Sequence, residues 1–390
     1  MSNCYCLPGR AGGTPVGLAT RGASPEDLAL AAQILDDNVL TLGFARRFAT
    51  YKRPNLLLHD PSRLLNILMN QERPVQIVIA GKTHPQDVEG QEMIRQWFEF
   101  ARRLEARSRV VFLSNYDVLM AEHLVQGVDV WVNTPRRPWE ASGTSGMKVL
   151  VNGGLNLSEL DGWWTEAYSP EVGWAIGDGR EHGDDPSWDA AEAESLYALL
   201  EREVVPEFYA RDEHGIPRGW VARMRESMAR LTPAFSANRA VRQYTEEHYL
   251  SAAAAFLERT QNRGSMGAEL VAWRAELAKH WSALRFGPAT VEQQGEGHLF
   301  HVQVFLDDID PDAVSVEFYA EAQKDEAPIT LAMNRDQNPA EAASAFTYSA
   351  LVPTGRLVAD YTPRLIPRHT GAFVPLEASF ILWHEAPSWR

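Results

Sequence analysis

The feature that most constrains how this chain can fold is a regular alternation of short apolar runs with amphipathic segments. The predicted strands are residues 40–44, 75–80, 110–113, 128–132 and 155–157. Strands that are apolar on both faces are typical of parallel sheets covered by helices on each side. Residues 88–104, between two of these runs, carry apolar side chains at helical spacing, as a covering helix requires. We therefore predict an α/β fold with a Rossmann-like parallel sheet.

A short polar segment, residues 140–148, follows the fourth strand and opens a predicted helix. Its small residues Gly143, Thr144 and Gly146 let backbone N–H groups approach an anion, and the helix adds the positive end of its dipole. Lys148 follows one turn later, where its amine could pair with a phosphate or form a Schiff base with an aldehyde cofactor. The segment does not fit the P-loop pattern, and ordinary helix capping is the alternative that its local chemistry leaves open.

A basic cluster stands at the end of the first predicted strand. Four cations lie within eight residues there: Arg46, Arg47, Lys52 and Arg53. Solvated surface charges are the alternative explanation. However, ligands of parallel sheets bind beyond the carboxyl ends of the strands, and arginine forks and lysine amines suit phosphate oxygens. We interpret the cluster as an anion site that two phosphates would balance better than one.

Composition limits the kinds of partner. A formal net charge of -15 argues against a nucleic-acid partner. No window approaches the roughly 18 apolar residues of a membrane span, and the N-terminus lacks an apolar signal-peptide core, so we predict no membrane partner and a cytoplasmic location. The two cysteines, Cys4 and Cys6, are too close for an unstrained disulfide or a self-sufficient metal site, and we predict no metal.

The pattern of the chain changes along its length, which predicts four parts. Residues 1–24 are rich in Gly, Pro and Ser and are expected to form a disordered leader. Residues 25–262 would form the Rossmann-like domain with its C-terminal helices, and residues 263–285 a linking helix. In residues 286–390, strand patterns are divided by Asp, Pro and Gly turns, which predicts a small β-rich, sandwich-like domain.

The chain resembles the C-terminal half of an α-glucan (glycogen, starch or maltodextrin) phosphorylase, especially of the shorter bacterial branch. The matching segments are GFARRFATYKR, AGKTHPQD, FLSNYDVLMAEHLVQGVDVWVNTPRRPWEASGTSGMK, NGGLNLSELDGWW and FSANRAVRQYTEEHYL. Their number and order, between about residues 38 and 257, make the resemblance specific.

The resemblance implies a fold, a cofactor and a reaction. In this family a GT-B fold places the active site between two Rossmann-like domains, and pyridoxal 5′-phosphate forms a Schiff base with the lysine that matches Lys148. The cofactor phosphate lies against inorganic phosphate, which protonates the glycosidic oxygen and then attacks the anomeric carbon with retention, giving glucose 1-phosphate. Cations must offset the repulsion of the two phosphates. The catalytic residues implied are Arg47, Lys52 and Lys148.

Further binding residues carry over position by position. Besides Lys148, the residues implied to contact the cofactor are Arg46, Tyr116, Thr144, Ser145 and Gly146. Those implied to bind the glucosyl hydroxyls are Glu140, Ala141, Ser142 and Gly143.

Some positions depart from the family pattern. Asp117 stands where the animal and plant enzymes have a basic residue, so one of their charge contacts is missing. Ser145-Gly146 replaces the Gly-Asn pair of the longer enzymes and is associated with the short branch.

In the family, an N-terminal domain forms the other wall of the cleft. The 38 or so residues before the first matching strand are expected to be too few to form such a domain. A complementary N-terminal half chain is therefore the implied partner, besides α-1,4-glucan and inorganic phosphate, and family members are often homodimers. Two alternatives remain open: a non-catalytic module that binds pyridoxal phosphate or glucan, and a GT-B glycosyltransferase of the glycogen synthase kind.

Overall fold

The computed structural model describes residues 35–103, 105–113, 116–295, 297–323, 327–336, 345–353 and 355–385. The predicted leader, residues 1–24, lies outside this range. The chain divides into two compact units, residues 1–241 and 242–390. The boundaries predicted at residues 262 and 285 stay predictions, although the first lies at a kink, Gln261–Gly264, within helix α12 (Leu250–His280).

The first unit is built on a six-stranded parallel sheet of order β3-β2-β1-β4-β5-β6. Its strands are β1 (Leu40–Ala45), β2 (Val75–Ala80), β3 (Val110–Leu113), β4 (Val130–Asn133), β5 (Leu155–Glu159) and β6 (Gly173–Ile176). Every residue of β1, β2, β4 and β5 is buried, which fits strands covered on both faces. The predicted α/β class with a parallel sheet is confirmed.

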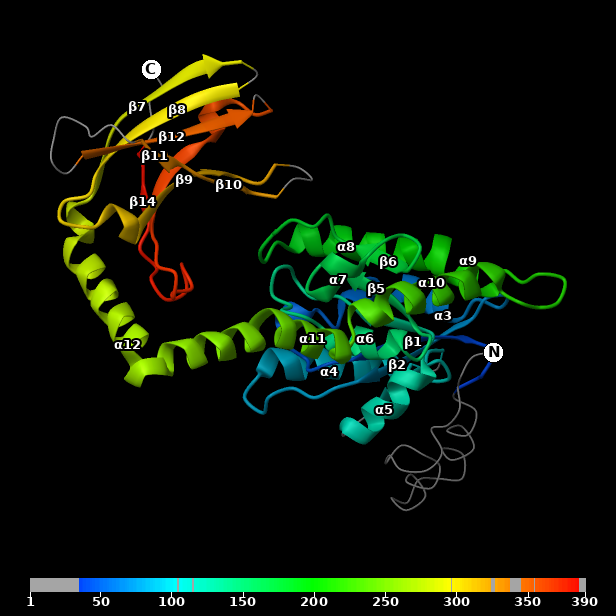
Figure 1. Cartoon of the computed structure of the whole chain (residues 1–390). Coiled ribbons are helices and arrows are strands. Elements are labelled where there is room, and N and C mark those ends of the chain that lie inside the picture. Colours follow the sequence, from blue (N-terminus) through cyan, green and yellow to red (C-terminus); the bar gives the residue numbers. More distant parts are fainter. Residues whose placement is uncertain are drawn as a thin grey trace. The chain divides into compact units, whose positions relative to one another are not determined.

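Helices cover both faces of this sheet (Figure 1). Successive residues of a strand point to opposite faces, so Ile77 and Ile79 join one apolar core and Val78 and Ala80 another. The first core receives α3 (Pro61–Leu68), α4 (Val88–Ala101), α8 (Pro186–Leu199), α9 (Val205–Tyr209) and α10 (Arg218–Ala234). The second receives α5 (Val118–Gly127) and α6 (Thr144–Leu150). A third, smaller core lies around α7 (Trp163–Ala167).

The second unit contains two antiparallel sheets of four strands each, of order β10-β9-β13-β14 and β11-β12-β8-β7. The strands are β7 (Arg285–Gln294), β8 (Gly297–Phe305), β9 (Val314–Ala320), β10 (Ile329–Ala332), β11 (Asn334–Arg335), β12 (Ala345–Pro353), β13 (Thr362–Pro367) and β14 (Leu382–Trp383). Both sheets contribute to one apolar core, with Phe300 from one and Phe318 from the other, 4.8 Å apart between ring centroids. The strands therefore pack as a β-sandwich.

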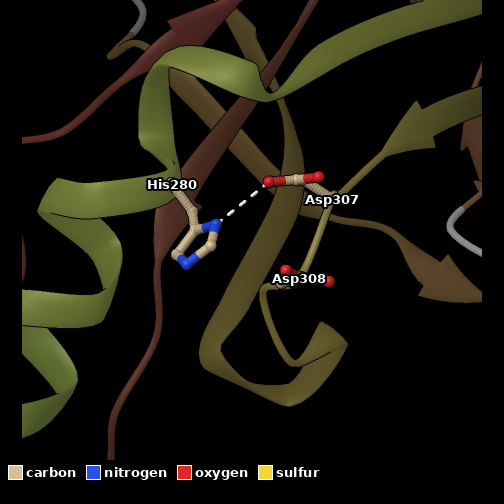
Figure 2. Close-up of side chains that lie close together, drawn as sticks. All are labelled: His280, Asp307 and Asp308. Atoms are coloured by element: carbon tan, nitrogen blue, oxygen red, sulfur yellow. Dashed lines mark hydrogen bonds and ion pairs between the residues drawn. The ribbon is translucent and has the colours of Figure 1, made fainter.

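His280, the last residue of α12, is tied to the loop after β8. Its Nδ1 lies 3.0 Å from Asp307 Oδ2 (Figure 2). Its Nε2 lies 3.3 Å from Glu276 Oε2. His280, Asp307 and Asp308 have ligand atoms within 4.8 Å of one another, but Asp307 and Asp308 are exposed and both ring nitrogens already face a carboxylate. The hydrogen bond from His280 lowers the pKa of Asp307. We interpret the group as a hydrogen-bonded contact that holds the helix end to the sandwich.

Among the residues that the structure describes, no helix has both the length and the apolar character needed to cross a bilayer.

Candidate functional site

The candidate site lies where the strand order of the parallel sheet reverses. Strand β1 pairs with β2 on one side and with β4 on the other, so the connections after β1 and β4 depart toward opposite ends of the sheet. A crevice opens at such a point, beyond the carboxyl ends of the strands. Arg46 and Arg47 directly follow β1, and the segment from Asn133 to Glu140 leads away from β4. The topology thus brings the basic cluster close to Glu140, at the end of that segment.

Glu140 is the centre of a buried ion cluster. Arg46 Nη2 lies 2.7 Å and Lys52 Nζ lies 3.0 Å from the same carboxylate oxygen, Oε2. All three side chains are at least nine-tenths buried. Burial alone would raise the pKa of Glu140, but the charges of Arg46 and Lys52 outweigh it and lower that pKa below its ordinary value. The carboxylate is therefore ionised at neutral pH, and Oε1 has no partner among the described residues.

Three further buried residues hold this cluster, and the sequence analysis missed them. Arg46 Nη1 donates to Asn133 Oδ1, and Asn133 Nδ2 donates to Ser158 Oγ at 3.0 Å. The Glu140 amide donates to Asp161 Oδ2 at 2.8 Å. Asn133 and Ser158 belong to strands β4 and β5, and Asp161 follows β5. Their position as polar residues near the carboxyl ends of strands could have marked them in the sequence as part of the site. The backbone as well as the carboxylate of Glu140 is thereby fixed.

Helix α6 begins next to this cluster with its first amides uncapped. Its N-cap is Gly143, in the left-handed conformation (φ 83°), and no side chain caps the helix. The first turn therefore keeps N–H groups that a bound anion can accept from. Asn156 Nδ2 donates to the Gly146 carbonyl at 3.2 Å, and Trp131 Nε1 donates to Ser145 Oγ at 3.2 Å. These two hydrogen bonds from β4 and β5 fix the position of the turn. These residues fit the phosphate of a cofactor such as pyridoxal phosphate.

Gly146 leaves no space for a side chain. A Cβ at this position would lie 2.4 Å from Asn156 Oδ1 and 3.1 Å from the ring of Trp163, both of which are buried. We expect Gly146→Ala to lower the free energy of unfolding by about 1–3 kcal/mol, because the start of α6 must shift. Gly127→Ala is the matched control, since its Cβ would meet nothing within 4 Å, and it should be neutral or slightly stabilising. Urea unfolding measures both; equal effects would contradict the close packing at Gly146.

The remaining predicted site residues differ in their surroundings. Arg47, Ala141, Thr144 and Lys148 are exposed, while Ser142 and Tyr116 are half-buried. Arg47 and the Lys148 amine form no hydrogen bond or ion pair with another side chain in the described part of the chain. Tyr116 packs against the core that α5 and α6 share, and burial raises its pKa. The structure thus brings together Glu140, Arg46 and Lys52 by direct contact, and within the described residues it leaves Arg47 and the Lys148 amine unpaired.

Arg53, the fourth cation of the basic cluster, is part of an internal network instead. Its guanidinium donates to the carbonyls of Thr134 and Pro135 at 3.0 and 2.9 Å. It also bonds three carboxylates, at 2.9 Å from Asp189, at 3.3 Å from Glu159 and at close range from Glu192. Arg53, Glu159 and Glu192 are all less than a tenth exposed. The arginine therefore ties the segment after β4 to α8 and is unavailable to an external anion.

This network predicts an unusual pH dependence of stability. Burial first, and then the neighbouring Glu192, raise the pKa of Glu159 from 4.5 to about 9. Between these pH values the folded chain keeps a proton that the unfolded chain releases, so stability falls as the pH rises, by at most about 1.4 kcal/mol per unit. Glu159→Gln should remove this slope, and Glu166→Gln, at an exposed site, should keep it. Denaturant unfolding between pH 5 and 9 is the measurement; parallel curves for wild type and Glu159→Gln would contradict it.

Comparison with known proteins identifies the first unit. The family model described as carbohydrate phosphorylase matches residues 33–173, which include the whole ion cluster and helix α6. These residues are therefore similar to carbohydrate phosphorylases.

Similar relatives extend the phosphorylase likeness beyond residue 173. The glycogen phosphorylase of Mycobacterium tuberculosis is 45% identical over 275 residues, which are 70% of this chain and 32% of the relative. The glycogen phosphorylase of Aquifex aeolicus is 47% identical over 227 residues, 58% of this chain and 32% of the relative. The maltodextrin phosphorylase of Thermococcus litoralis is 38% identical over 341 residues, 86% of this chain and 40% of the relative. The chain thus spans about a third of the length of the phosphorylases that it matches.

Proposed function

We propose that this chain forms the cofactor- and phosphate-binding side of an α-1,4-glucan phosphorylase site in a GT-B fold. The observation that carries the proposal is the arrangement around Glu140, because one carboxylate oxygen is fixed by two buried cations and the other is unpaired. The reaction is phosphorolysis: the C1–O bond of the terminal glucosyl unit breaks, a C1–O bond to phosphate forms with retention, and the leaving 4-hydroxyl takes a proton. The names of the relatives support the substrate class.

Each proposed site residue acts through its charge or its backbone. Glu140 Oε1 accepts hydrogen bonds from glucosyl hydroxyls and orients the sugar, together with Ala141, Ser142 and Gly143. Arg47 holds inorganic phosphate, because its exposed guanidinium has no internal partner and suits two phosphate oxygens. Lys52, already 3.0 Å from Glu140, keeps positive charge between the sugar and the phosphates. The exposed charge of Arg47 thus remains for the substrate, while Lys52 and Arg46 fix Glu140.

The cofactor we propose is pyridoxal 5′-phosphate, joined to the amine of Lys148. The uncapped first turn of α6, with Thr144, Ser145 and Gly146, would hold its phosphate, and Arg46 and Tyr116 would stand on the cofactor side. When bound, its phosphate group supplies a proton donor and acceptor beside inorganic phosphate. Lys148 is exposed, so its amine is accessible to the aldehyde.

We infer that an N-terminal part of the kind found in the relatives completes the cleft. The chain corresponds to about a third of those proteins, and a site that brings two phosphates together needs to exclude water. This part, whether in the same polypeptide or in a partner chain, and a homodimer of the completed enzyme are proposed from the family resemblance.

Reconstitution tests the activity. The chain, loaded with pyridoxal phosphate, is combined with a protein that spans the part of the Mycobacterium relative that the match does not cover. We expect release of glucose 1-phosphate from maltodextrin and phosphate, and a loss of at least about a hundredfold in kcat/KM for Glu140→Ala, since a charged partner of the substrate is removed. An assembled, cofactor-loaded complex that releases no glucose 1-phosphate would favour the non-catalytic alternative.

A further inference from the structure

Trp139 is an exposed aromatic residue in a segment whose backbone is held on both sides. It directly precedes Glu140 and is 61% exposed. Its amide donates to the Arg136 carbonyl at 3.0 Å, and the Arg136 amide donates to the Tyr51 carbonyl. On the other side, the Glu140 amide donates to Asp161 at 2.8 Å. These bonds fix the backbone that carries the indole, although the ring itself is left in water.

The side chain of Arg136 anchors the same segment a second time. Its guanidinium lies 2.7 Å from Asp189 Oδ2 and 3.1 Å from Asp184 Oδ1. It also donates to the Gly183 carbonyl at 2.7 Å. Since Asp189 is part of α8, the segment that carries Trp139 is joined to that helix. A ligand that covers the indole therefore removes apolar surface from water without having to order a loop.

A series of contacts joins the indole to the ion cluster around Glu140. The ring of Trp139 lies 6.0 Å from the ring of Tyr51 between centroids, at an interplanar angle of 36°. Tyr51 belongs to the short helix η1 (Thr50–Lys52), and the amine of Lys52 lies 4.8 Å from the centre of its ring. The same amine is 3.0 Å from Glu140 Oε2. The two rings thus form an aromatic surface that begins at a cation holding Glu140.

The chemistry of this surface favours a sugar ring over a charged group. The faces of aromatic rings carry partial negative charge, so an anion is better suited to the guanidinium of Arg47. A sugar ring has C–H faces that pack on an aromatic ring, and hydroxyls that donate to a carboxylate oxygen. Glu140 offers such an oxygen, Oε1, which has no partner among the described residues.

We propose that Trp139, with Tyr51 beside it, packs against a glucosyl ring of the bound glucan and determines specificity for the substrate. The sugar is named on the basis of the proposed function, which places the terminal glucosyl unit at Glu140. In the series of contacts, Trp139 lies beyond Tyr51, so it meets the glucosyl unit next to the terminal one. The indole thereby favours an oligosaccharide over a single glucose.

Calorimetric titration of the reconstituted, cofactor-loaded complex with maltopentaose, in the absence of inorganic phosphate, tests the proposal. We expect Trp139→Leu to raise the dissociation constant about tenfold, because the ring contact is lost. Trp139→Phe should raise it less than about threefold, because an aromatic ring remains. Glucose, which reaches only Glu140, should bind both variants as it binds the wild type.

Trp383→Leu is the matched control, because Trp383 is also exposed and also packs on a tyrosine ring. It is 40% exposed and lies 5.6 Å from the ring of Tyr319, within the second unit. Its replacement should leave the binding of maltopentaose unchanged. Since Trp139 is largely in solvent, Trp139→Leu should keep the wild-type melting temperature, which separates weaker binding from unfolding.

Steady-state phosphorolysis separates a sugar contact from two other roles of the indole. Trp139→Leu should raise the KM for maltopentaose and leave the KM for phosphate unchanged. A raised KM for phosphate, or reduced pyridoxyl labelling of Lys148, would place the indole at the cofactor. Weaker assembly with the N-terminal part, together with unchanged binding of maltopentaose by the assembled complex, would place it at that interface. Either result overturns the proposal.

Failure of this proposal is distinguishable from failure of the proposed function, because the titration requires no turnover. A wild-type complex that binds maltopentaose but releases no glucose 1-phosphate would contradict phosphorolysis, and the Trp139 variants would still decide the sugar contact. Equal binding of maltopentaose by wild type and Trp139→Leu, or equal losses of glucose and maltopentaose binding, would show the proposal to be wrong. Absence of binding by the wild-type complex would overturn it as well.

Discussion

Arg53→Ala should lower the free energy of unfolding of the first unit by about 3–5 kcal/mol, which is the usual cost of removing one partner of a buried ion pair. The arginine contacts three carboxylates, and Glu159 and Glu192 are 2% and 4% exposed. Without Arg53 the buried Glu192 loses its only described cationic partner, while the protonated Glu159 and the carbonyls of Thr134 and Pro135 each lose a hydrogen-bond donor. Desolvation of the unpaired groups, more than the lost contacts themselves, sets the size of the effect.

Arg47→Ala is the matched control for this experiment. Arg47 lies six residues upstream, is exposed and has no described partner, so its removal should change the free energy of unfolding by less than about 0.5 kcal/mol. Guanidinium unfolding of both variants, followed by tryptophan fluorescence, gives the comparison. A loss below about 1 kcal/mol for Arg53→Ala would mean that the network is open to water.

A second variant identifies the cause of the Arg53 effect. Replacing Arg53 by Met together with Glu159→Gln and Glu192→Gln removes the charges along with their partner, and should recover much of the lost stability. If the combined variant is as unstable as Arg53→Ala, the lost packing and backbone bonds of the arginine are responsible instead of the buried carboxylates.

Incubation of the chain with pyridoxal phosphate, followed by borohydride reduction, should attach one pyridoxyl group at Lys148 and at no other lysine. The amine is exposed and unpaired, and it lies one turn beyond the uncapped start of α6, where the phosphate would bind. Lys148→Ala should abolish the stable label. Peptide mapping by mass spectrometry measures the site and the stoichiometry.

Lys82 provides the control for this labelling, since it too is exposed and follows a strand of the same sheet. Lys82→Ala should leave the label on Lys148 unchanged. Label distributed over several lysines, or a label that survives Lys148→Ala at the same stoichiometry, would remove the cofactor assignment. Reduced labelling in Gly146→Ala would connect the cofactor to the first turn of α6, because that substitution shifts the turn without removing the lysine itself.

Continuous apolar strands could be predicted from sequence, whereas the short β6, which contains Gly173, and strands at exposed positions could not. Strand β2 has the predicted bounds and β1 extends one residue further, because a continuous apolar run has few other ways to be buried. Strand β7 has no clear strand pattern in the sequence, because most of its residues are exposed at one edge of its sheet. Strand β13 contains Pro363 and Pro367, which argue against a strand, and yet it lies between β9 and β14.

The sequence by itself determined the class of the fold and the identity of the candidate site segments. Apolar periodicity dictates a parallel sheet, and the sheet places the residues after β1 and β4 at one edge, so the basic cluster and Glu140 had to lie near each other. The alternation of turns and strands likewise required a β-rich second unit.

Only the tertiary structure decided what each charge does. The four cations of the basic cluster cannot be told apart by their sequence. In the structure, Arg46 and Lys52 bind Glu140, and Arg47 is exposed. Arg53 is surrounded by buried carboxyl groups from β5 and α8. The carboxyl partners of Arg53 lie more than a hundred residues away along the chain. The charge state of a side chain depends on its burial and on charges within a few ångströms, and those distances exist only after the chain has folded.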